Sequence, residues 1–318
     1  AVAMYTFHGL ANAIITESGI NFYHTHRLEQ VDDLTQLELI IGALDDLNNP
    51  AIRPPAQSEK YVLEVAKLIS ELKREEISPE RLRRLTQIDI ERIKTDTIHH
   101  RRGDIMVKWQ MVADAYDRTL ALADVYEQYQ QQLATNGWYD FDDMILFVIR
   151  AFREDPLLKA QYQEQFQYIL VDEYQDTNNA QNELLRLFSD QFAAPNLFVV
   201  GDDKQSIYRF QGASIVNLRQ FLTWYPETTI IALKDNYRSF QLLLDIAADL
   251  ITQNKSQLIH DPKLVAMVKT LEAKQDWFGT IAVQEYATAD AEVLGVAEQI
   301  LSLLKSGTSP QEIAVIYR

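Results

Sequence analysis

The sequence predicts an α/β protein, in which a three-layer domain is interrupted by an all-helical insertion and followed by a second, partial α/β unit. Three observations predict this fold. Short apolar runs, typical of buried strands, each end in a polar loop. Helical periodicity without strands fills the region between two such α/β segments. Strand and helix patterns then alternate along the rest of the chain, which is typical of a sheet covered by helices.

The first segment of the three-layer domain spans residues 1–28. Leu10, Ala11, Ile14 and Ile15 are spaced as on one face of a helix. We therefore expect a helix in this segment, packed by these side chains against the rest of the domain.

The helical insertion spans residues 29–137. Apolar side chains recur at helical spacing from Val62 to Leu72, and Ser78-Pro79 marks a helix end followed by a new start. A longer helical pattern leads to Asn136-Gly137, which is a typical helix end. We expect helices without strands in this region.

The second segment of the three-layer domain spans residues 138–225, and the partial second unit spans residues 226–318. In the former, Asp140 and Asp143 open a helix whose acidic first turn suits the helix dipole. In the latter, alternating patterns predict strands near 229–233, 280–286 and 313–317 and helices at 240–252 and 290–305.

The composition is that of an ordinary globular protein in a reducing compartment. The 318 residues include 47% hydrophobic and 24% charged side chains and no cysteine, which excludes disulfides and thiolate metal sites. No apolar run is long enough to cross a membrane, and we expect a cytoplasmic protein. The net charge of −16 opposes the approach of a polyanion such as DNA.

The most specific pattern in the sequence is the octapeptide Val171-Asp-Glu-Tyr-Gln-Asp-Thr-Asn178. It follows an apolar strand pattern, so the carboxylates of Asp172 and Glu173 lie where that strand ends. Ligands of open α/β sheets bind outside the carboxyl ends of the strands. At such a position an Asp can hold Mg²⁺ beside a nucleotide, and a Glu can deprotonate an attacking water. The pattern therefore predicts a site of nucleotide hydrolysis.

Two more polar loops follow predicted strands, namely Gly201–Ala213 and Lys234–Ser239. Together with Tyr5-Thr-Phe-His-Gly-Leu10, these segments resemble, in the correct order, motifs Ib, II, III and IV of the superfamily 1 DNA helicases of the UvrD/Rep/PcrA group. Ile313–Arg318 resembles the strand before the large second insertion of that family. The resemblance implies a RecA-like (P-loop NTPase-type) domain with a helical insertion, followed by a partial second RecA-like domain.

The resemblance implies a role in ATP hydrolysis for four residues. Asp172 is similar to the Mg²⁺ ligand and Glu173 to the catalytic base of motif II. Gln205 is similar to the γ-phosphate sensor of motif III, and Arg238 to the motif IV arginine that reaches the γ-phosphate. A guanidinium group suits this contact because its geometry matches phosphate oxygens. The alternative for each residue is an ordinary strand-end, loop or surface position.

The resemblance also implies contacts with DNA. Phe7 and His8 look like motif Ib contacts with the DNA strand, and Tyr208 and Phe210 look like the rings that stack on bases. The alternative for both rings is core packing. The sequence departs from the family where Phe210 replaces a frequent Trp and Gln211 a frequent Arg. Loss of that charge predicts a weaker dependence of DNA affinity on salt.

The phosphate-binding (Walker A) loop of such motors is missing from the sequence. The 318 residues contain no Gly-Lys-Ser/Thr triplet, and motifs V and VI of the family are absent. We therefore expect an internal fragment, inactive alone, of an ATP-dependent 3′→5′ helicase. The full-length parent would use ATP and Mg²⁺ and would bind single-stranded DNA and junctions of single-stranded with duplex DNA.

Two other functions remain open from the sequence. The chain can be the motor portion of a helicase–nuclease of the RecB/AddA kind, or a non-enzymatic remnant that binds DNA or a protein partner. A nuclease domain in the neighbouring sequence would favour the first, and the absence of any upstream phosphate loop would favour the second.

Overall fold

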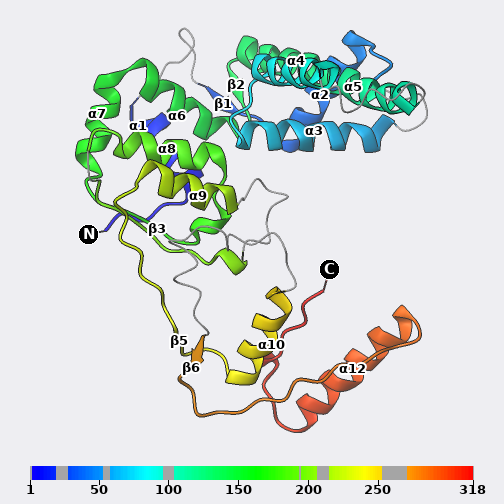
Figure 1. Ribbon diagram of the computed structural model, residues 1–318, viewed down its shortest axis with the longest axis vertical. Helices are drawn as coiled ribbons and strands as arrows, with labels where there is room; N and C mark the ends of the chain where they lie inside the picture. The colour runs from blue at the N-terminus through cyan, green and yellow to red at the C-terminus, as the bar shows by residue number, and fades with distance from the viewer. Residues whose placement is uncertain are drawn as a thin grey trace. The chain divides into compact units, whose positions relative to one another are not determined.

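The computed structural model describes residues 2–18, 28–52, 58–95, 104–192, 195–205, 215–252 and 271–317. The chain divides into two compact units between Ile230 and Ile231 (Figure 1). In the described residues of both units, helices predominate and the strands are short and parallel. Every described helix is too short or too polar to cross a membrane.

The first unit contains a core formed by four helices. Ile14, Phe152 and Leu184 are almost completely buried in it. The helix predicted from the apolar spacing near the start of the sequence is confirmed as α1 (Phe7–Glu17). The hydroxyl of Thr6 caps this helix by accepting the N–H of Gly9 at 3.0 Å. The helices are α1, α6 (Asp143–Glu154), α7 (Pro156–Gln165) and α8 (Asn179–Ser189).

A short sheet in the first unit confirms two of the predicted strands. β3 (Ile169–Val171) and β4 (Leu197–Val199) pair in parallel, with Ile169 opposite Leu197. The side chains on one face of the pair pack against Phe221 of α9 (Ile215–Trp224). Each strand is followed by a turn of 3₁₀ helix, η2 (Tyr174–Asp176) after β3 and η3 (Asp203–Gln205) after β4.

One face of this short sheet is uncovered among the described residues. Leu170 of β3 and Phe198 of β4 are 71% and 59% exposed. Successive side chains of a strand point to opposite faces, so an uncovered face exposes every second residue. Within the described ranges, helices therefore cover one face of this sheet.

The region predicted to be a helical insertion has a core of its own, in which Ile40, Ile69 and Tyr129 are fully buried. Its ends lie side by side because β1 (Glu29–Gln30) and β2 (Trp138–Tyr139) pair in parallel. The prediction of a region without strands is therefore wrong at Glu29–Gln30, which finds a partner strand more than 100 residues away. The predicted helix before Ser78-Pro79 and the long helix that ends at Asn136 are both confirmed. The helices are α2 (Asp33–Leu47), α3 (Ser58–Arg74), α4 (Pro79–Thr95) and α5 (Asp104–Asn136).

In the second unit the predicted helices are confirmed and the predicted strands are wrong. Residues 229–233, 280–286 and 313–317 form no regular strand. A strand is held by hydrogen bonds to a neighbour, and side chains in these segments, such as Val283 and Ile316, are almost fully exposed. The regular elements are β5 (Asp235–Asn236), which pairs in parallel with β6 (Glu272–Ala273), the helices α10 (Gln241–Thr252) and α12 (Ala289–Lys305), and the 3₁₀ helix η5 (Pro310–Glu312).

Candidate functional site

The two adjacent carboxylates of the octapeptide follow β3 directly, and both residues are exposed. Glu173 has a left-handed backbone conformation with φ of 49°, which is uncommon for a residue other than glycine. Its N–H donates to Asp172 Oδ1 at 3.0 Å. Sparsely populated conformations of this kind concentrate at functional sites, where the surroundings enforce them. The turn therefore marks Asp172 and Glu173 as candidates on geometric grounds.

A line of hydrogen bonds joins Glu173 to Gln205. The buried side chain of Gln175 donates through Nε2 to Glu173 Oε2 at 2.6 Å, and its Oε1 accepts the N–H of Asp202 at 2.9 Å. Asp202 Oδ2 accepts from Gln205 Nε2 at 2.8 Å. Because a backbone N–H can only donate, the Gln175 amide has one orientation, with its nitrogen toward Glu173. The loops after β3 and β4 thus form one connected network.

This network depends on a close backbone approach at Gly201. A Cβ atom there would lie 2.8 Å from Gln175 Oε1, so a side chain at this position would displace the Gln175 amide. Asn217 of α9 also contacts this region by donating Nδ2 to the Thr177 carbonyl at 2.7 Å. Neither Gln175 nor Gly201 can be recognised from the sequence as a site residue, because their roles depend on contact between two loops that are distant in sequence.

The two motif Ib residues occupy different environments. Phe7 is half-buried and packs against both the main core and the side chains around Phe221. His8 stacks on Phe141, with ring centroids 3.8 Å apart and planes inclined by 18°. Phe141 is 49% exposed. The two stacked rings therefore offer an aromatic surface, to which Phe141, missed by the sequence analysis, contributes.

The other predicted residues lie elsewhere in the chain. Tyr208, Phe210 and Gln211 fall outside the described residues. Arg238 belongs to the second unit, where it is exposed in the turn after β5. Asn236 Oδ1 shapes that turn by accepting the N–H of Arg238 at 3.0 Å and that of Ser239 at 2.7 Å.

Asp172 is the residue predicted to hold Mg²⁺. Its carboxylate is exposed at the end of the strand, with one oxygen accepting the Glu173 N–H. Across the described ranges, no group of three or more potential ligands gathers at one point. Mg²⁺ is commonly held by one or two carboxylates together with substrate phosphates and water. The donor set around Asp172 therefore fits an ion that is shared with a nucleotide.

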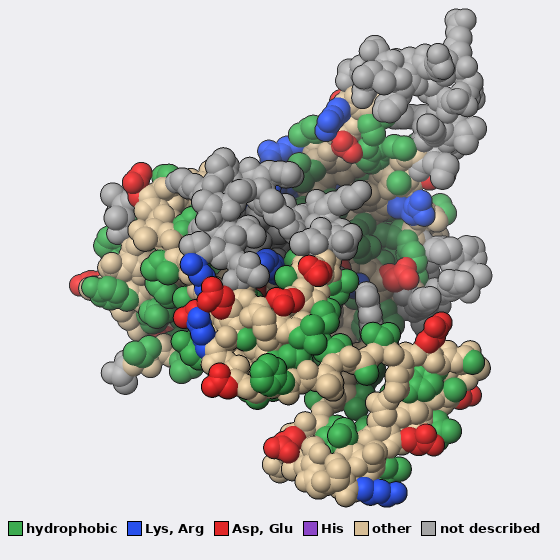
Figure 2. All heavy atoms as spheres, turned by 60° about the horizontal axis from the view of Figure 1, so that its bottom comes forward, with side chains coloured by type: hydrophobic (Ala, Val, Ile, Leu, Met, Phe, Trp, Pro, Cys, Tyr) green, Lys and Arg blue, Asp and Glu red, His purple; other side chains and the backbone are tan. Residues whose placement is uncertain are grey.

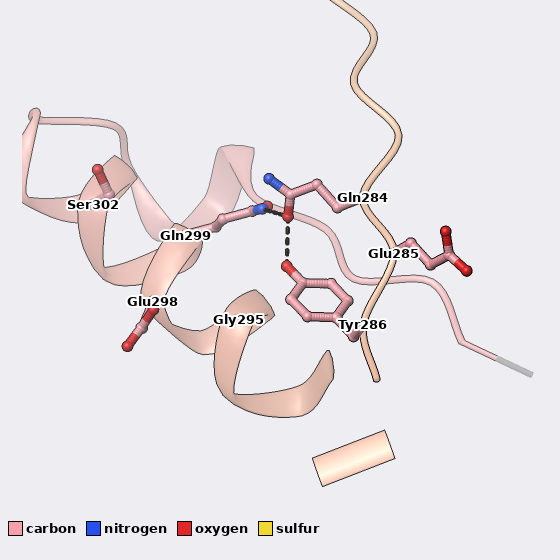
Figure 3. Close-up of a pocket in the computed structure, with 7 residues that line it drawn as sticks. All are labelled: Gln284, Glu285, Tyr286, Gly295, Glu298, Gln299 and Ser302. Carbon is pink, nitrogen blue, oxygen red and sulfur yellow. Dashed lines mark hydrogen bonds between the residues drawn. The ribbon is translucent and has the colours of Figure 1, made fainter. Parts of the chain in front are cut away.

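A surface hollow in the second unit contains none of the predicted site residues. It has a volume of about 490 Å³ and lies between α12 and residues 284–286 (Figure 3). Gln284 Oε1 accepts hydrogen bonds from the Tyr286 hydroxyl and from Gln299 Nε2. The hollow is thus lined by hydrogen-bonded amide and phenol groups together with the carboxylates of Glu285 and Glu298.

The titration of His8 is expected to make the protein less stable in mild acid. Burial lowers the pKa of His8 from its ordinary value of 6.5, Asp142 opposes this shift and Arg74 adds to it. As the pH falls through 6.5, the unfolded chain takes up the proton first, so the free energy of unfolding decreases. Urea unfolding at pH 7.5 and at pH 5.5 measures the effect. His8→Phe, which keeps a ring beside Phe141, is the comparison, because Asp143, whose pKa burial raises to about 6, titrates with the opposite effect in both proteins. From pH 7.5 to pH 5.5 the free energy of unfolding should change more favourably in the variant than in the wild type, and an equal change would contradict the expectation.

Comparisons with known proteins support the resemblance to the UvrD/Rep/PcrA group. The family of the UvrD/REP helicase N-terminal domain matches residues 1–226. The ATP-dependent DNA helicase PcrA of Staphylococcus aureus (strain NCTC 8325 / PS 47) is 39% identical over 197 residues, which are 62% of this chain and 26% of that helicase. PcrA of Staphylococcus epidermidis (strain ATCC 12228 / FDA PCI 1200) matches with the same identity and coverage. The matched part thus spans about a quarter of the length of these relatives.

Proposed function

Because this chain belongs to the family of the UvrD/REP helicase N-terminal domain, we propose that it supplies part of the ATP site and of the DNA track of a cytoplasmic helicase. The complete protein would hydrolyse ATP, move 3′→5′ along single-stranded DNA and open the duplex at a junction. The observation that carries this proposal is the hydrogen-bonded line from Glu173 through Gln175 and Asp202 to Gln205.

Glu173 is proposed as the base that accepts a proton from the attacking water. Gln175 donates to Oε2 of Glu173 and holds the carboxylate in place. A base held by its neighbours needs little rearrangement to reach the water, which is how positioning accelerates a reaction. Gln205 is proposed to contact the γ-phosphate. The hydrogen bond from Gln205 to Asp202 supports this role. A shift of Gln205 would move Asp202, and the hydrogen bonds of Gln175 would transmit that movement to Glu173.

Asp172 and Arg238 are proposed to hold the nucleotide. Asp172 would bind Mg²⁺, which neutralises charge on the phosphates when bound. The exposed guanidinium of Arg238 would contact the γ-phosphate from the second unit, and the turn formed by Asn236 fixes the backbone that carries it. ATP and Mg²⁺ are thus the proposed cofactors of the complete protein.

The DNA track is proposed to be aromatic rather than basic. Phe7, His8, Tyr208 and Phe210 are the proposed contacts, and the exposed ring of Phe141 beside His8 adds another. On the face shown in Figure 2, the described Lys and Arg side chains lie as separate groups among acidic and apolar ones. With a net charge of −16, stacking on bases is better suited to this surface than phosphate contacts are.

Weak binding of single-stranded DNA with a shallow salt dependence is expected for this chain. The change Tyr208→Ala with Phe210→Ala should weaken binding by the loss of stacking, which contributes about 1–3 kcal/mol per base. Fluorescence anisotropy with an oligothymidine at several salt concentrations measures both quantities. Tyr168→Ala is the matched control, because Tyr168 is an exposed ring just before β3, at the opposite end from Asp172. Unchanged affinity of the double variant, or a steep salt slope, would refute the aromatic track.

A further inference from the structure

We propose that Lys73, on the helical insertion, is a positioning residue for the aromatic surface of Phe141 and His8. It would act through a buried ion cluster, the Lys73 cluster, which consists of Lys73, Asp140, Asp143 and Tyr129. The inference rests on the proposed DNA track, and it adds the element that holds part of that track in place.

The Lys73 cluster joins the insertion to the start of α6. Lys73 is 1% exposed at the end of α3, and its ammonium contacts Asp140 Oδ2 and lies 2.8 Å from Asp143 Oδ1. The Tyr129 hydroxyl of α5 donates to Asp140 Oδ2 at 2.8 Å. The ammonium also lies 5.1 Å from the centroid of the Tyr129 ring. Two helices of the insertion therefore hold the same carboxylate.

The Lys73 cluster and the neighbouring Arg74 together hold the acidic side chains of the turn from 140 to 143. Asp140 and Asp143 accept each other's N–H, at 3.1 Å and 3.0 Å, and both face Lys73. The next residue of α3, Arg74, donates to Asp142 Oδ1 at 3.0 Å. Three carboxylates of this turn are thus bound to α3. Phe141 is left as the residue that faces outward, against the ring of His8.

An ionic contact suits positioning better than stabilisation. Buried ion pairs seldom stabilise a fold more than apolar side chains of the same size would, because desolvation offsets the attraction. They are directional, however, so a single arrangement satisfies both aspartates and the ammonium. An apolar contact between α3 and this turn would permit the insertion to slide and Phe141 to turn. The cluster therefore fixes the register between the insertion and the aromatic surface.

The test removes the charges of Lys73, Asp140 and Asp143 together, so that no buried charge is left without a partner. In Lys73→Met with Asp140→Asn and Asp143→Asn, the midpoint of thermal unfolding should stay near that of the wild type. The affinity for an oligothymidine should fall about fivefold or more, as for one lost base stack. Phe141→Ala added to this variant should cause no further loss, since the two changes act through the same ring. Additive losses, or unchanged affinity of the triple variant, would overturn the inference.

Distance measurements provide a second readout. Because the chain contains no cysteine, spin labels at Gln87→Cys on α4 and Glu154→Cys on α6, both exposed, report the spacing of insertion and core. The distribution of distances between the two spin labels should be broader in the triple variant than in the wild type. An unchanged distribution would also overturn the inference. Arg83→Met with Asp124→Asn, an ion pair within the insertion, is the control that should change neither readout.

Two further variants separate the possible failures. If the triple variant does not fold, Asp142→Ala replaces it, since it removes the contacts through which Arg74 and Ser70 of α3 hold the same turn. Unchanged affinity of Asp142→Ala would then count against positioning of Phe141 by α3. If Phe141→Ala alone leaves the affinity unchanged, the proposed DNA contact of Phe141 fails. If Phe141→Ala lowers the affinity and the triple variant does not, the proposed DNA contact of Phe141 is supported and the proposed positioning by Lys73 fails.

Discussion

Lys73→Met alone is expected to destabilise the first unit by about 3–5 kcal/mol at pH 7, because it leaves buried carboxylates without their cation. Burial by itself raises the pKa of Asp140, and the ammonium of Lys73 outweighs this effect and holds that pKa below its ordinary value. Burial, opposed by Lys73 and reinforced by Asp140, raises the pKa of Asp143 to about 6. Without Lys73 both carboxylates would be more costly to ionise. Urea unfolding followed by circular dichroism measures the loss.

The pH dependence of this loss provides an internal check. Without the ammonium, the folded state binds protons at a higher pH than the unfolded chain, so the stability of Lys73→Met should rise as the pH falls toward about 4. The gap between variant and wild type should therefore narrow in acid. Arg83→Met is the matched control, since its partly exposed ion pairs with Asp124 and Glu127 contribute about 0–1 kcal/mol. A loss below about 1 kcal/mol for Lys73→Met would contradict the structure of the cluster.

The sequence predicted those elements whose evidence is local. The strands before Asp172 and Gly201 are short apolar runs, and the structure contains a strand in each of them, Ile169–Val171 and Leu197–Val199. Helices with a regular apolar face were found as well, including the one that starts at Pro79. The position of Asp172 and Glu173 immediately after a strand follows from the same local order, whereas the left-handed backbone of Glu173 is seen only in the structure.

Features that depend on distant partners could not be predicted in this way. Residues 280–286 and 313–317 have the apolar pattern of strands, but a strand forms only beside a neighbour, and no strand among the described residues pairs with them. Lys73 lies in an ordinary amphipathic helix, so its sequence context gives no sign of burial. Its carboxylate partners are 67 and 70 positions away, and burial of a Lys is exceptional unless it is paired.

Glu173→Gln is expected to lower ATP turnover of a complete helicase that contains this chain by about 10²–10⁴-fold, the usual contribution of a general base. An amide keeps the size of the side chain and cannot accept the proton of the attacking water. Binding of nucleotide should persist, since Asp172, Gln205 and Arg238 are unchanged. The 318-residue chain alone is expected to show no turnover, with or without single-stranded DNA, because it contains no Gly-Lys-Ser/Thr phosphate loop.

The most direct test of the proposed ATP site is therefore a coupled ATPase assay of that complete protein with saturating single-stranded DNA. Glu164→Gln, a change of an exposed glutamate on α7, is the matched control and should retain wild-type turnover. The account predicts that turnover is lost in Glu173→Gln while a fluorescent ATP analogue still binds. Turnover of Glu173→Gln within twofold of the wild type would contradict it.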